Sequence, residues 1–540
     1  MQPWVWRIPE RFNIGVACTD AHLGTPVADR PAVVVDDDAV GVRSVTFREL
    51  AARTGRFGEV LRTLGVAAGD RVLIRLPNCL EYSTAFLGTM KWGAIPVPTS
   101  TMLTPGEVEY LATDSGAVAM VTDARTWNAM HERLERQAAL RHVLRVGTDD
   151  AVPGERITVH DLESWLAAVL RWEEAHPTRA DDPAYLVYTS GTTGYPKGVL
   201  HAHRALLGRQ PSSEYWFDFD PAGDRVLHAG KYNWTYVLGT GLMDPLYRGH
   251  TAIVCEGAAD ATRWPRRIAR HGATIFIAVP TIYRQVLQKT TYVGRDVPTL
   301  RHCMSAGEQL PAEVLAAWRA RFGLEIYEGL GMTECSYYLS EVKGRPIRPG
   351  SAGFPQPGHD VRLLDPATSD EVPQDTEGMI CLPRTDPGLM LRYWNQPEET
   401  ARSFQGEWFL TGDYARRDAD GYLWFLGRKD DLINTFGYRV SPYEVERVLK
   451  GHPDVGEVAA VGEEVAPGKV LVAAYVIPRA PGAIGADAVL DYAAEHLASY
   501  KAPRVVYLVD DFPRTPNGKV LRRALRPEAA RARASSAGAA

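Results

Sequence analysis

Short apolar segments alternate with amphipathic segments along the first four-fifths of the chain. The runs 72–76, 94–98 and 117–122 are largely apolar, whereas 81–92 and 105–113 have the spacing of helices. Apolar runs of about four to eight residues are typical of strands covered on both faces. Strands that alternate with helices favour βαβ units. This part of the chain is therefore predicted to be α/β, with mostly parallel sheets.

The same alternation continues through the middle of the chain. Apolar runs at 184–188, 273–279 and 325–327 predict further buried strands, and 311–321 has helical spacing. We expect two stacked α/β/α layers, followed by a smaller β-rich subdomain from about 358 to 427.

The pattern changes after residue 431. Helical spacing at 442–450 and 486–497 frames two expected strands at 455–461 and 470–477. A segment of this size forms a compact α+β module. The predicted organisation is a large N-terminal domain at 1–427, a hinge at 428–431, a small mobile C-terminal domain at 432–526 and a disordered tail at 527–540.

Composition excludes several classes of protein. The net charge of -6 provides no basic footprint for nucleic acid. The N-terminal 1–24 carries charges and a proline rather than a signal peptide, and no run reaches the ~20 apolar residues of a membrane span. We expect a soluble, cytoplasmic protein with reduced thiols. The six cysteines show no CxxC spacing, which argues against a zinc site or disulfide framework: Cys18, Cys79, Cys255, Cys303, Cys335 and Cys381.

A loop of small residues follows the expected strand at 184–188. The segment 189–194 reads Thr-Ser-Gly-Thr-Thr-Gly, and Lys197 follows it closely. Glycines let backbone N–H groups turn inward, hydroxyls add donors, and the lysine adds a positive charge. The spacing differs from that of a Walker P-loop. A flexible surface loop is the alternative, but the strand and the lysine favour a phosphate site formed by Thr189, Ser190, Gly191, Thr192, Thr193, Gly194 and Lys197.

The run 189–198 resembles the phosphate-binding signature of the adenylate-forming superfamily. This superfamily includes acyl-CoA and aryl-CoA synthetases, the adenylation domains of peptide synthetases, and firefly luciferase. Segment 327–334, Tyr-Glu-Gly-Leu-Gly-Met-Thr-Glu, resembles its second signature. The resemblance implies that Tyr327 stacks on adenine, Thr333 contacts the α-phosphate and Glu334 binds Mg²⁺. It also implies nucleotide contacts from Gly307, Glu308, Glu328 and Gly329.

Later segments extend the resemblance over nearly the whole chain. Trp408–Asp413 resembles the signature whose aspartate binds the ribose hydroxyls, and Arg428 falls at a second ribose contact. Asp430 falls at the family's hinge position, although an ordinary turn aspartate is the alternative. Segment 434–446 resembles the loop and helix of thioester formation, with Gly437, Tyr438 and Arg439 at the coenzyme A loop. Many relatives have Ser-Gly where this chain has Phe436-Gly437. Lys519, after a Pro-Asn-Gly turn, falls at the catalytic lysine.

These likenesses imply a two-step ligase. ATP and a carboxylic acid give an acyl-adenylate and pyrophosphate, and the acyl group then passes to coenzyme A. Segment 231–240 is similar to that of benzoate-type and medium-chain acyl-CoA ligases, which indicates an aromatic, alicyclic or medium-chain acid. The expected acyl pocket consists of Trp234, Tyr236, Ala306 and Gly331. Ordinary core packing is the alternative for the two aromatic residues.

Other functions share parts of this pattern. An amino-acid adenylation domain would carry a Phe-Asp-x-Ser type segment, which the sequence lacks. A free-standing ligase that loads a carrier protein, and a luciferase-like oxygenase, share the same motifs. A non-enzymatic nucleotide sensor would be expected to lose Lys519 or Glu334. The sequence leaves the preferred acid and any homodimer open.

Overall fold

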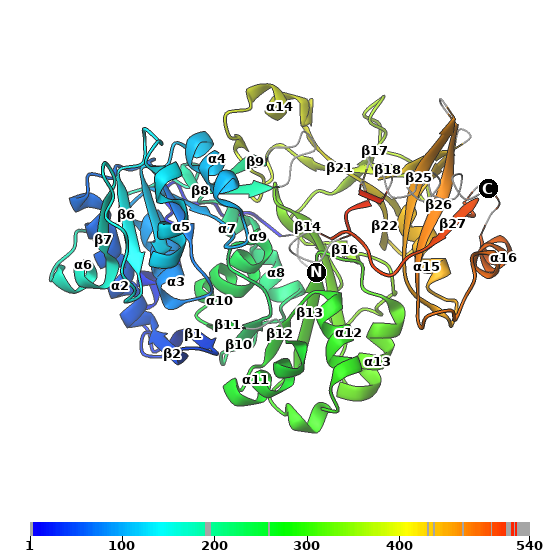
Figure 1. Ribbon diagram of the computed structural model, residues 1–540, viewed down its shortest axis with the longest axis horizontal. Helices are drawn as coiled ribbons and strands as arrows, with labels where there is room; N and C mark the ends of the chain where they lie inside the picture. The colour runs from blue at the N-terminus through cyan, green and yellow to red at the C-terminus, as the bar shows by residue number, and fades with distance from the viewer. Residues whose placement is uncertain are drawn as a thin grey trace. The chain divides into compact units, whose positions relative to one another are not determined.

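The structure is a computed structural model (Figure 1). It describes residues 4–189, 196–257, 260–428, 431–435, 438–466, 469–497, 499, 501–514, 520–522 and 524–525. Two compact units divide the chain: Met1–Asp360 with Pro383–Glu407, and Val361–Leu382 with Trp408–Ala540. The predicted α/β fold is confirmed, whereas the predicted domain limits at 427 and 432 stay predictions.

The first unit contains a five-stranded parallel sheet in its described part. The strand order is β4 (Ile95–Pro98), β3 (Arg71–Arg75), β5 (Ala119–Asp123), β6 (His142–Val146) and β7 (Thr158–Asp161). Successive side chains of a strand point to opposite faces. Val72 therefore packs on the side of α2 (Phe47–Thr63) and α3 (Leu80–Lys91), whereas Leu73 packs on the side of α4 (Pro105–Ser115) and α5 (Ala124–Leu134). Burial on both faces explains the continuous apolar run and confirms the predicted βαβ units.

A nine-stranded sheet, counted over the described residues, forms the second layer of this unit. Its central strands β10 to β14 are parallel, so their carboxyl ends lie at the same edge. The strand order is β16 (Phe354–Pro355), β15 (Ser336–Ser340), β14 (Ile326–Met332), β13 (His302–Ala306), β12 (Ile275–Ile277), β10 (Arg225–His228), β11 (Thr251–Glu256), β1 (Pro31–Asp37) and β2 (Gly41–Thr46). Helices α11 (Trp264–His271), α12 (Pro280–Lys289) and α13 (Ala312–Phe322) pack on one face (Figure 1).

A smaller sheet of the first unit carries the predicted phosphate loop. Strand β8 (Pro183–Thr189) pairs antiparallel with β9 (Lys197–Ala202), which also pairs with β19 (Arg392–Tyr393). The opposite face of the nine-stranded sheet carries Trp216, which follows α8 (Gln210–Tyr215), and the segment from α9 (Thr235–Leu238) through a π-helix (Gly239–Met243) to α10 (Asp244–Tyr247). Single-turn π-helices are often found at functional sites.

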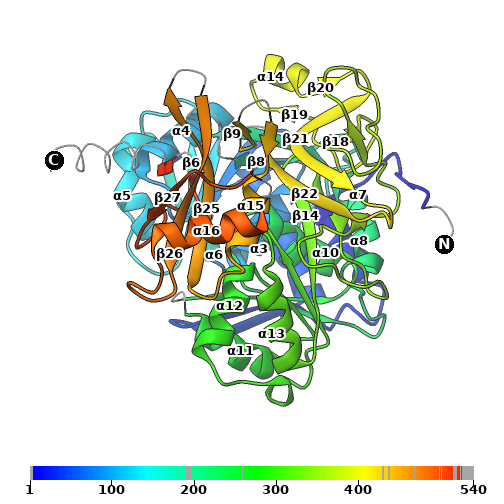
Figure 2. The ribbon, with the colours of Figure 1, turned by 90° about the vertical axis from the view of Figure 1, so that its right-hand side faces the viewer.

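The second unit combines an antiparallel sheet with an α+β module. Strands β17 (Arg362–Leu364), β18 (Gly378–Pro383), β21 (Trp408–Arg417) and β22 (Leu423–Arg428) belong to this sheet. The module contains β25 (Val455–Ala466), β26 (Lys469–Pro478) and β27 (Val505–Leu508). Helices α15 (Pro442–Leu449) and α16 (Ala486–His496) bury their apolar residues against one face of these strands (Figure 2). The elements predicted between 442 and 497 are confirmed.

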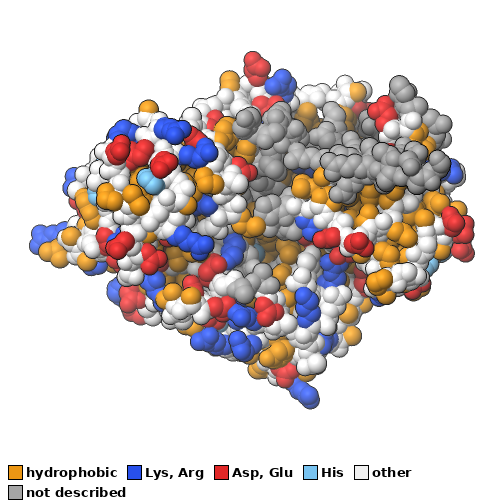
Figure 3. Space-filling view, viewed as in Figure 1, with side chains coloured by type: hydrophobic (Ala, Val, Ile, Leu, Met, Phe, Trp, Pro, Cys, Tyr) orange, Lys and Arg blue, Asp and Glu red, His pale blue; other side chains and the backbone are white. Residues whose placement is uncertain are grey.

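None of the helices in the described part of the chain is long and apolar enough to cross a bilayer. On the face shown in Figure 3, acidic and basic side chains of the described residues are interspersed. This distribution agrees with the small net charge of -6.

Candidate active site

Lys197 begins β9 directly opposite Thr189, the last residue of β8. The predicted loop residues between them, 190–194, lie outside the described part of the structure. The Lys197 side chain is 14% exposed and its Nζ forms an ion pair with Glu399. It also lies 5.5 Å from the centroid of the Tyr393 ring. The hairpin thus holds one ammonium group at the end of the predicted phosphate loop.

Tyr393 links this lysine to the predicted metal ligand. Its hydroxyl donates to Glu334 Oε1 at 2.9 Å. The adjacent Thr333 carbonyl accepts from His201 Nε2 at 2.8 Å, and the His201 ring stacks on Tyr185 at 4.7 Å. Burial lowers the pKa of His201 to about 3, so this imidazole is neutral near pH 7. The structure therefore brings Lys197, Thr333 and Glu334 together on β9 and the turn after β14.

Two residues that contact Lys197 and Glu334, namely Glu399 and Tyr393, lie in no motif that the sequence analysis identified. Glu399 lies 202 residues from Lys197, and Tyr393 lies 59 residues from Glu334. The Lys197 side chain holds the pKa of the Glu399 carboxyl below its usual value, mainly through its hydrogen bond. The short strand β19 pairs with β9 and so helps to bring this segment to the site. The sequence alone does not distinguish Glu399 from the many other carboxylates that could pair with Lys197.

Strand β14 places the second signature beside β13. The Tyr327 ring stacks on His302, with centroids 4.7 Å apart. The next residue, Glu328, is half-buried, and its carboxyl group accepts the Leu310 N–H at 3.3 Å. Burial raises the pKa of Glu328 well above its ordinary value, and the nearby Glu341 raises it further. Stacking of Tyr327 on adenine stays a prediction.

The two signature glycines have different surroundings. A Cβ at Gly329 would lie 2.4 Å from Cζ2 of Trp216, so the absence of a side chain lets the indole approach β14. A Cβ at Gly331 would lie 2.0 Å from the Ser336 carbonyl oxygen, in the pairing with β15. Gly329 therefore contacts the indole ring of Trp216, whereas Gly331 packs closely against the backbone of β15.

The end of β13 contacts Trp234 of the predicted acyl pocket. Gly307 has φ +90°, and a Cβ there would lie 2.9 Å from Cη2 of Trp234. The adjacent Glu308 accepts a hydrogen bond from the Thr281 hydroxyl at 2.9 Å. Ala306 packs in the same apolar cluster as Tyr236. Trp234, Tyr236 and Ala306 of the expected acyl pocket are therefore brought together beside Gly307, whereas Gly331, the fourth expected member, packs against the backbone of β15. Contact of these residues with an acid stays a prediction.

Further aromatic rings complete this wall. Tyr236 meets Trp234 edge to face at 5.3 Å and stacks on Trp216 at 6.3 Å. Trp216 donates from Nε1 to the Tyr327 carbonyl at 3.0 Å, which fixes its orientation. His228, at the end of β10, meets Tyr236 edge to face at 5.0 Å. Neither Trp216 nor His228 was identified from the sequence. Trp216 follows α8 and His228 ends β10, and only the tertiary structure brings them beside segment 234–236.

Asn78 positions the turn at 230–232, which precedes Trp234 and Tyr236. Its Nδ2 donates to the Gly230 carbonyl at 2.9 Å, and its Oδ1 accepts from the Tyr232 N–H at 2.9 Å. Its backbone N–H donates to Glu256 Oε2 at 2.8 Å, and Glu256 forms an ion pair with Lys231. These bonds tie the start of α3 to the segment before Trp234. Asn78 is a positioning residue that sequence reasoning missed.

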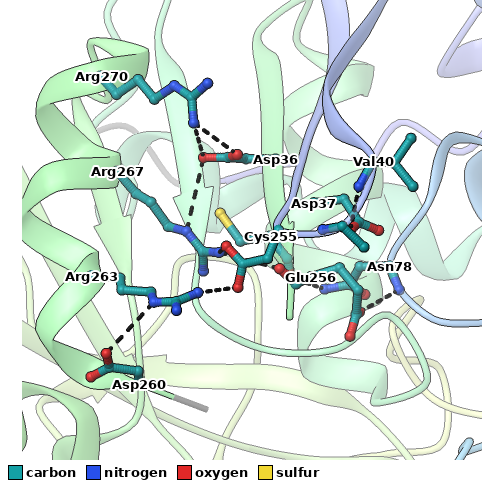
Figure 4. Close-up of polar contacts among 12 residues, drawn as sticks. Asp36, Asp37, Val40, Asn78, Cys255, Glu256, Asp260, Arg263, Arg267 and Arg270 are labelled. Carbon is teal, nitrogen blue, oxygen red and sulfur yellow. Dashed lines mark hydrogen bonds and ion pairs between the residues drawn. The ribbon is translucent and has the colours of Figure 1, made fainter. Parts of the chain in front are cut away.

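The same edge of the sheet is braced by ion pairs to α11. Figure 4 shows Asp36 at the end of β1 beside Arg267 and Arg270 of the helix. The distances are 3.9 Å to Arg267 Nε and 3.1 Å to Arg270 Nη1. Figure 4 also shows Glu256 beside Asn78. The arrangement holds the carboxyl ends of β1 and β11 against the helix.

The second unit contains both predicted ribose contacts. Asp413 and Arg428 face each other across β21 and β22, with Arg428 Nε 3.5 Å from Asp413 Oδ1. The backbone of β23 (Ile433–Thr435) pairs with β24 (Tyr438–Val440), which places Tyr438 and Arg439 in a hairpin. Asp430, Gly437, and the side chains of Tyr438 and Arg439 lie outside the described part of the structure.

The predicted catalytic lysine, Lys519, also lies outside the described residues, but the segment after it does not. Arg522 donates to both oxygens of Glu446, at 2.8 and 2.9 Å, and its guanidinium lies 4.4 Å from the Tyr443 ring centroid. Glu446 also accepts the Ala460 N–H at 2.8 Å. These contacts anchor the chain three residues beyond Lys519 to α15.

Comparison with known proteins identifies the family. A model of AMP-binding enzymes matches residues 22–394, and a model of the AMP-binding enzyme C-terminal domain matches 444–519. The chain belongs to the AMP-binding enzyme family. This AMP-binding enzyme is 35% identical over 525 residues to benzoate–CoA ligase of Thauera aromatica, covering 96% of this chain and 97% of that protein.

Solved structures of related proteins agree. The AMP-binding enzyme matches the anthranilate CoA ligase AuaEII in complex with anthranoyl-AMP with a TM-score of 0.86 and 33% identity, covering 98% of this chain and 99% of that one. It matches ATP-bound MatB of Rhodopseudomonas palustris with a TM-score of 0.85 and 29% identity, covering 96% and 98%. The predicted reaction class, an AMP-forming acyl- or aryl-CoA ligase that uses ATP and coenzyme A, is confirmed.

Proposed function

We propose that this enzyme activates an aromatic carboxylic acid, whose ring lies against the wall formed by Trp216, Trp234 and Tyr236. The observation that carries the proposal is this wall, in which Tyr236 lies 5.3 Å from Trp234 and 6.3 Å from Trp216. Aromatic rings prefer offset or edge-to-face contacts at such distances. The names of the similar benzoate and anthranilate ligases support the same acid class.

The first half-reaction needs charge neutralisation rather than a protein nucleophile. A carboxylate oxygen of the acid attacks the α-phosphorus of ATP, the new O–P bond forms, and pyrophosphate leaves. Lys197 neutralises phosphate charge, and Thr333 contacts the α-phosphate. In this proposal Lys519 bridges the acid carboxylate and the α-phosphate. Positioning and electrostatic stabilisation of this kind supply most of the rate in phosphoryl and nucleotidyl transfer.

Glu334 fits the predicted Mg²⁺. It presents a carboxylate that is oriented by the Tyr393 hydroxyl at 2.9 Å. Mg²⁺ is usually bound by one or two carboxylates together with substrate phosphates and waters, so a single oriented carboxylate is sufficient. The ion would neutralise charge on the triphosphate. Tyr327 and Glu328 are proposed for adenine, and Asp413 with Arg428 for the ribose hydroxyls.

The second half-reaction forms the thioester. The thiol sulfur of coenzyme A attacks the acyl carbon, AMP leaves, and the thiol proton passes to solvent. We assign Gly437, Tyr438 and Arg439 to the passage of coenzyme A, with Asp430 as the hinge between the two half-reactions. The cytoplasmic location and the homodimer stay predictions from the sequence.

A substrate screen tests the acid class. Pyrophosphate release is measured with benzoates, phenylacetates, cycloalkane carboxylates and straight-chain acids, each with and without coenzyme A. We expect the highest kcat/KM with an aromatic acid and thioester formation only with coenzyme A. Trp234→Leu should lower kcat/KM for the aromatic acid. The matched control is Trp264→Leu, since Trp264 packs on the other face of the sheet. A preference for straight chains, or equal effects of the two variants, contradicts the proposal.

A second experiment tests the assignment of Lys519. Lys519→Ala should abolish acyl-adenylate formation but retain thioester formation from a supplied acyl-adenylate. Equal losses in the two half-reactions are incompatible with this division of roles.

A further inference from the structure

Two buried polar atoms on the aromatic wall of Trp216, Trp234 and Tyr236 have no hydrogen-bond partner among the described residues. His228 is 1% exposed, and Tyr236 is half-buried with its hydroxyl inside the protein. Within the described ranges, neither His228 Nε2 nor the Tyr236 hydroxyl has a hydrogen-bond partner. A buried polar group without a partner is costly, so native proteins rarely retain one without a function.

The hydrogen-bonding role of His228 is fixed by its other ring nitrogen. The Gly230 N–H donates to His228 Nδ1 at 2.9 Å, so Nδ1 is the acceptor. In a neutral imidazole the remaining nitrogen, Nε2, then carries the proton. Burial lowers the pKa of His228 to about 3, which keeps the ring neutral near pH 7. His228 therefore presents an unused N–H donor.

The nine-stranded sheet places this donor on the same face as the aromatic wall of Trp216, Trp234 and Tyr236. His228 pairs with Ile277, which pairs in turn with Met304, and directly paired residues of parallel strands share a face. Ile277 and Met304 belong to the cluster that includes Tyr236. The His228 and Tyr236 rings are in edge-to-face contact at 5.0 Å. The donor and the phenolic hydroxyl therefore lie on the same wall.

We propose that His228 and Tyr236 recognise a hydroxyl substituent on the aromatic acid, so that the preferred substrate is a ring-hydroxylated acid rather than the unsubstituted one. This inference rests on the proposed aromatic acid. The substituent oxygen accepts from His228 Nε2–H, and its proton is donated to the Tyr236 hydroxyl oxygen. Both unpaired atoms of the wall are then satisfied by one group.

Other substituents match these two atoms less well. An arylamine nitrogen shares its lone pair with the ring and is a weak acceptor for the His228 donor. A second carboxylate would bring a charge to two neutral groups, and a buried charge without a counter-charge is costly. An alkyl group or hydrogen would leave both atoms unpaired. A hydroxyl group is the smallest substituent that both accepts and donates.

The test compares kcat/KM for the three hydroxybenzoate isomers, benzoate and the aminobenzoates in thioester formation with coenzyme A. We expect the wild-type enzyme to prefer one hydroxybenzoate isomer over benzoate by about tenfold or more, the factor of a buried hydrogen bond. Tyr236→Phe removes only the hydroxyl. His228→Asn retains an acceptor near Nδ1 and removes the Nε2 donor, whereas His228→Gln places an amide donor near Nε2.

The ratio of kcat/KM for the hydroxylated acid to that for benzoate should fall about tenfold in Tyr236→Phe and His228→Asn, and less in His228→Gln. The matched control is Tyr283→Phe, because the Tyr283 hydroxyl is already bonded to the Phe276 and Met304 backbone carbonyls and is not one of the two unpaired atoms. It should leave the ratio unchanged.

Two kinds of failure are distinguishable. A wild-type preference for benzoate or an aminobenzoate, or an unchanged ratio in Tyr236→Phe and His228→Asn, overturns the recognition by His228 and Tyr236 while the aromatic acid stands. Thioester formation with straight-chain acids and with none of the benzoates overturns the proposed acid class itself, and this inference with it.

Discussion

Gly307→Ala perturbs the contact between the end of β13, a proposed nucleotide contact, and Trp234 of the proposed acyl pocket. Gly307 has φ +90°, where a residue with a side chain is strained. The new methyl group would lie 2.9 Å from Cη2 and 3.2 Å from Cζ2 of Trp234. Because Gly307 is followed by the structured Glu308 turn, we expect the indole rather than the backbone to move.

The expected cost has two parts. The backbone conformation costs a residue with a Cβ about 1–2 kcal/mol. Overpacking against the indole adds about 1–3 kcal/mol, part of which is relieved when Trp234 shifts. A shift of the wall misplaces the acid, so we expect kcat/KM for the acid to fall about tenfold.

A control and a double variant separate these parts. Gly323→Ala has the same kind of strain, with φ +71°, but no atom lies within 4 Å of the new methyl group. It should lower the free energy of unfolding without changing the kinetics. Trp234→Phe removes the clashing ring atoms, so Gly307→Ala/Trp234→Phe should cost about 1 kcal/mol less than the sum of the single variants.

Urea unfolding and ATP–pyrophosphate exchange at varied acid concentration measure the two effects. Additive costs in the double variant, or the same loss of kcat/KM in Gly323→Ala, would refute the contact between Gly307 and the acyl wall as the cause.

Three further predictions concern residues around the site. Asn78→Ala should lower kcat/KM for the acid more than that for ATP, because the Gly230 carbonyl and the Tyr232 N–H lose their side-chain bonds at about 1–3 kcal/mol; exchange kinetics with each substrate varied in turn would show it. Arg522→Met should cost about 3–5 kcal/mol in urea unfolding, since buried Glu446 loses its counter-charge, whereas Arg522→Met/Glu446→Gln should recover most of it. Burial lowers the pKa of His203 from 6.5 to about 3. The unfolded chain therefore takes up a proton first, and this contribution to stability is complete above pH 6.5 and is lost as the pH falls toward 3. His203→Asn should reduce the slope of stability against pH by up to about 1.4 kcal/mol per pH unit, measured by circular dichroism.

Sequence patterns predicted the elements that depend on local rules. The run at 72–76 is a strand buried on both faces, and Thr104 caps the helix Pro105–Ser115 through a capping box with Glu107. The motifs also predicted that Lys197, Thr333 and Glu334 gather in one place, because each signature follows a strand whose position is set by the fold.

The missed residues act through contacts that only the tertiary structure creates. Asn78 lies 152 residues before Gly230, and Glu399 lies 202 residues after Lys197. From the sequence alone, Asn78 would be interpreted as an ordinary turn residue after a strand, and Glu399 as a surface carboxylate of a short helix. His228 ends an apolar strand and has no motif around it, so its unused donor becomes visible only beside Tyr236.

The acyl-adenylate mechanism is tested most directly by following oxygen from the acid. An aromatic acid labelled with ¹⁸O in its carboxylate is turned over with ATP and coenzyme A, and the products are analysed by mass spectrometry. If the carboxylate oxygen attacks the α-phosphorus, one ¹⁸O atom appears in the phosphate of AMP and the pyrophosphate is unlabelled. Unlabelled AMP, or ADP and labelled inorganic phosphate, would contradict the account.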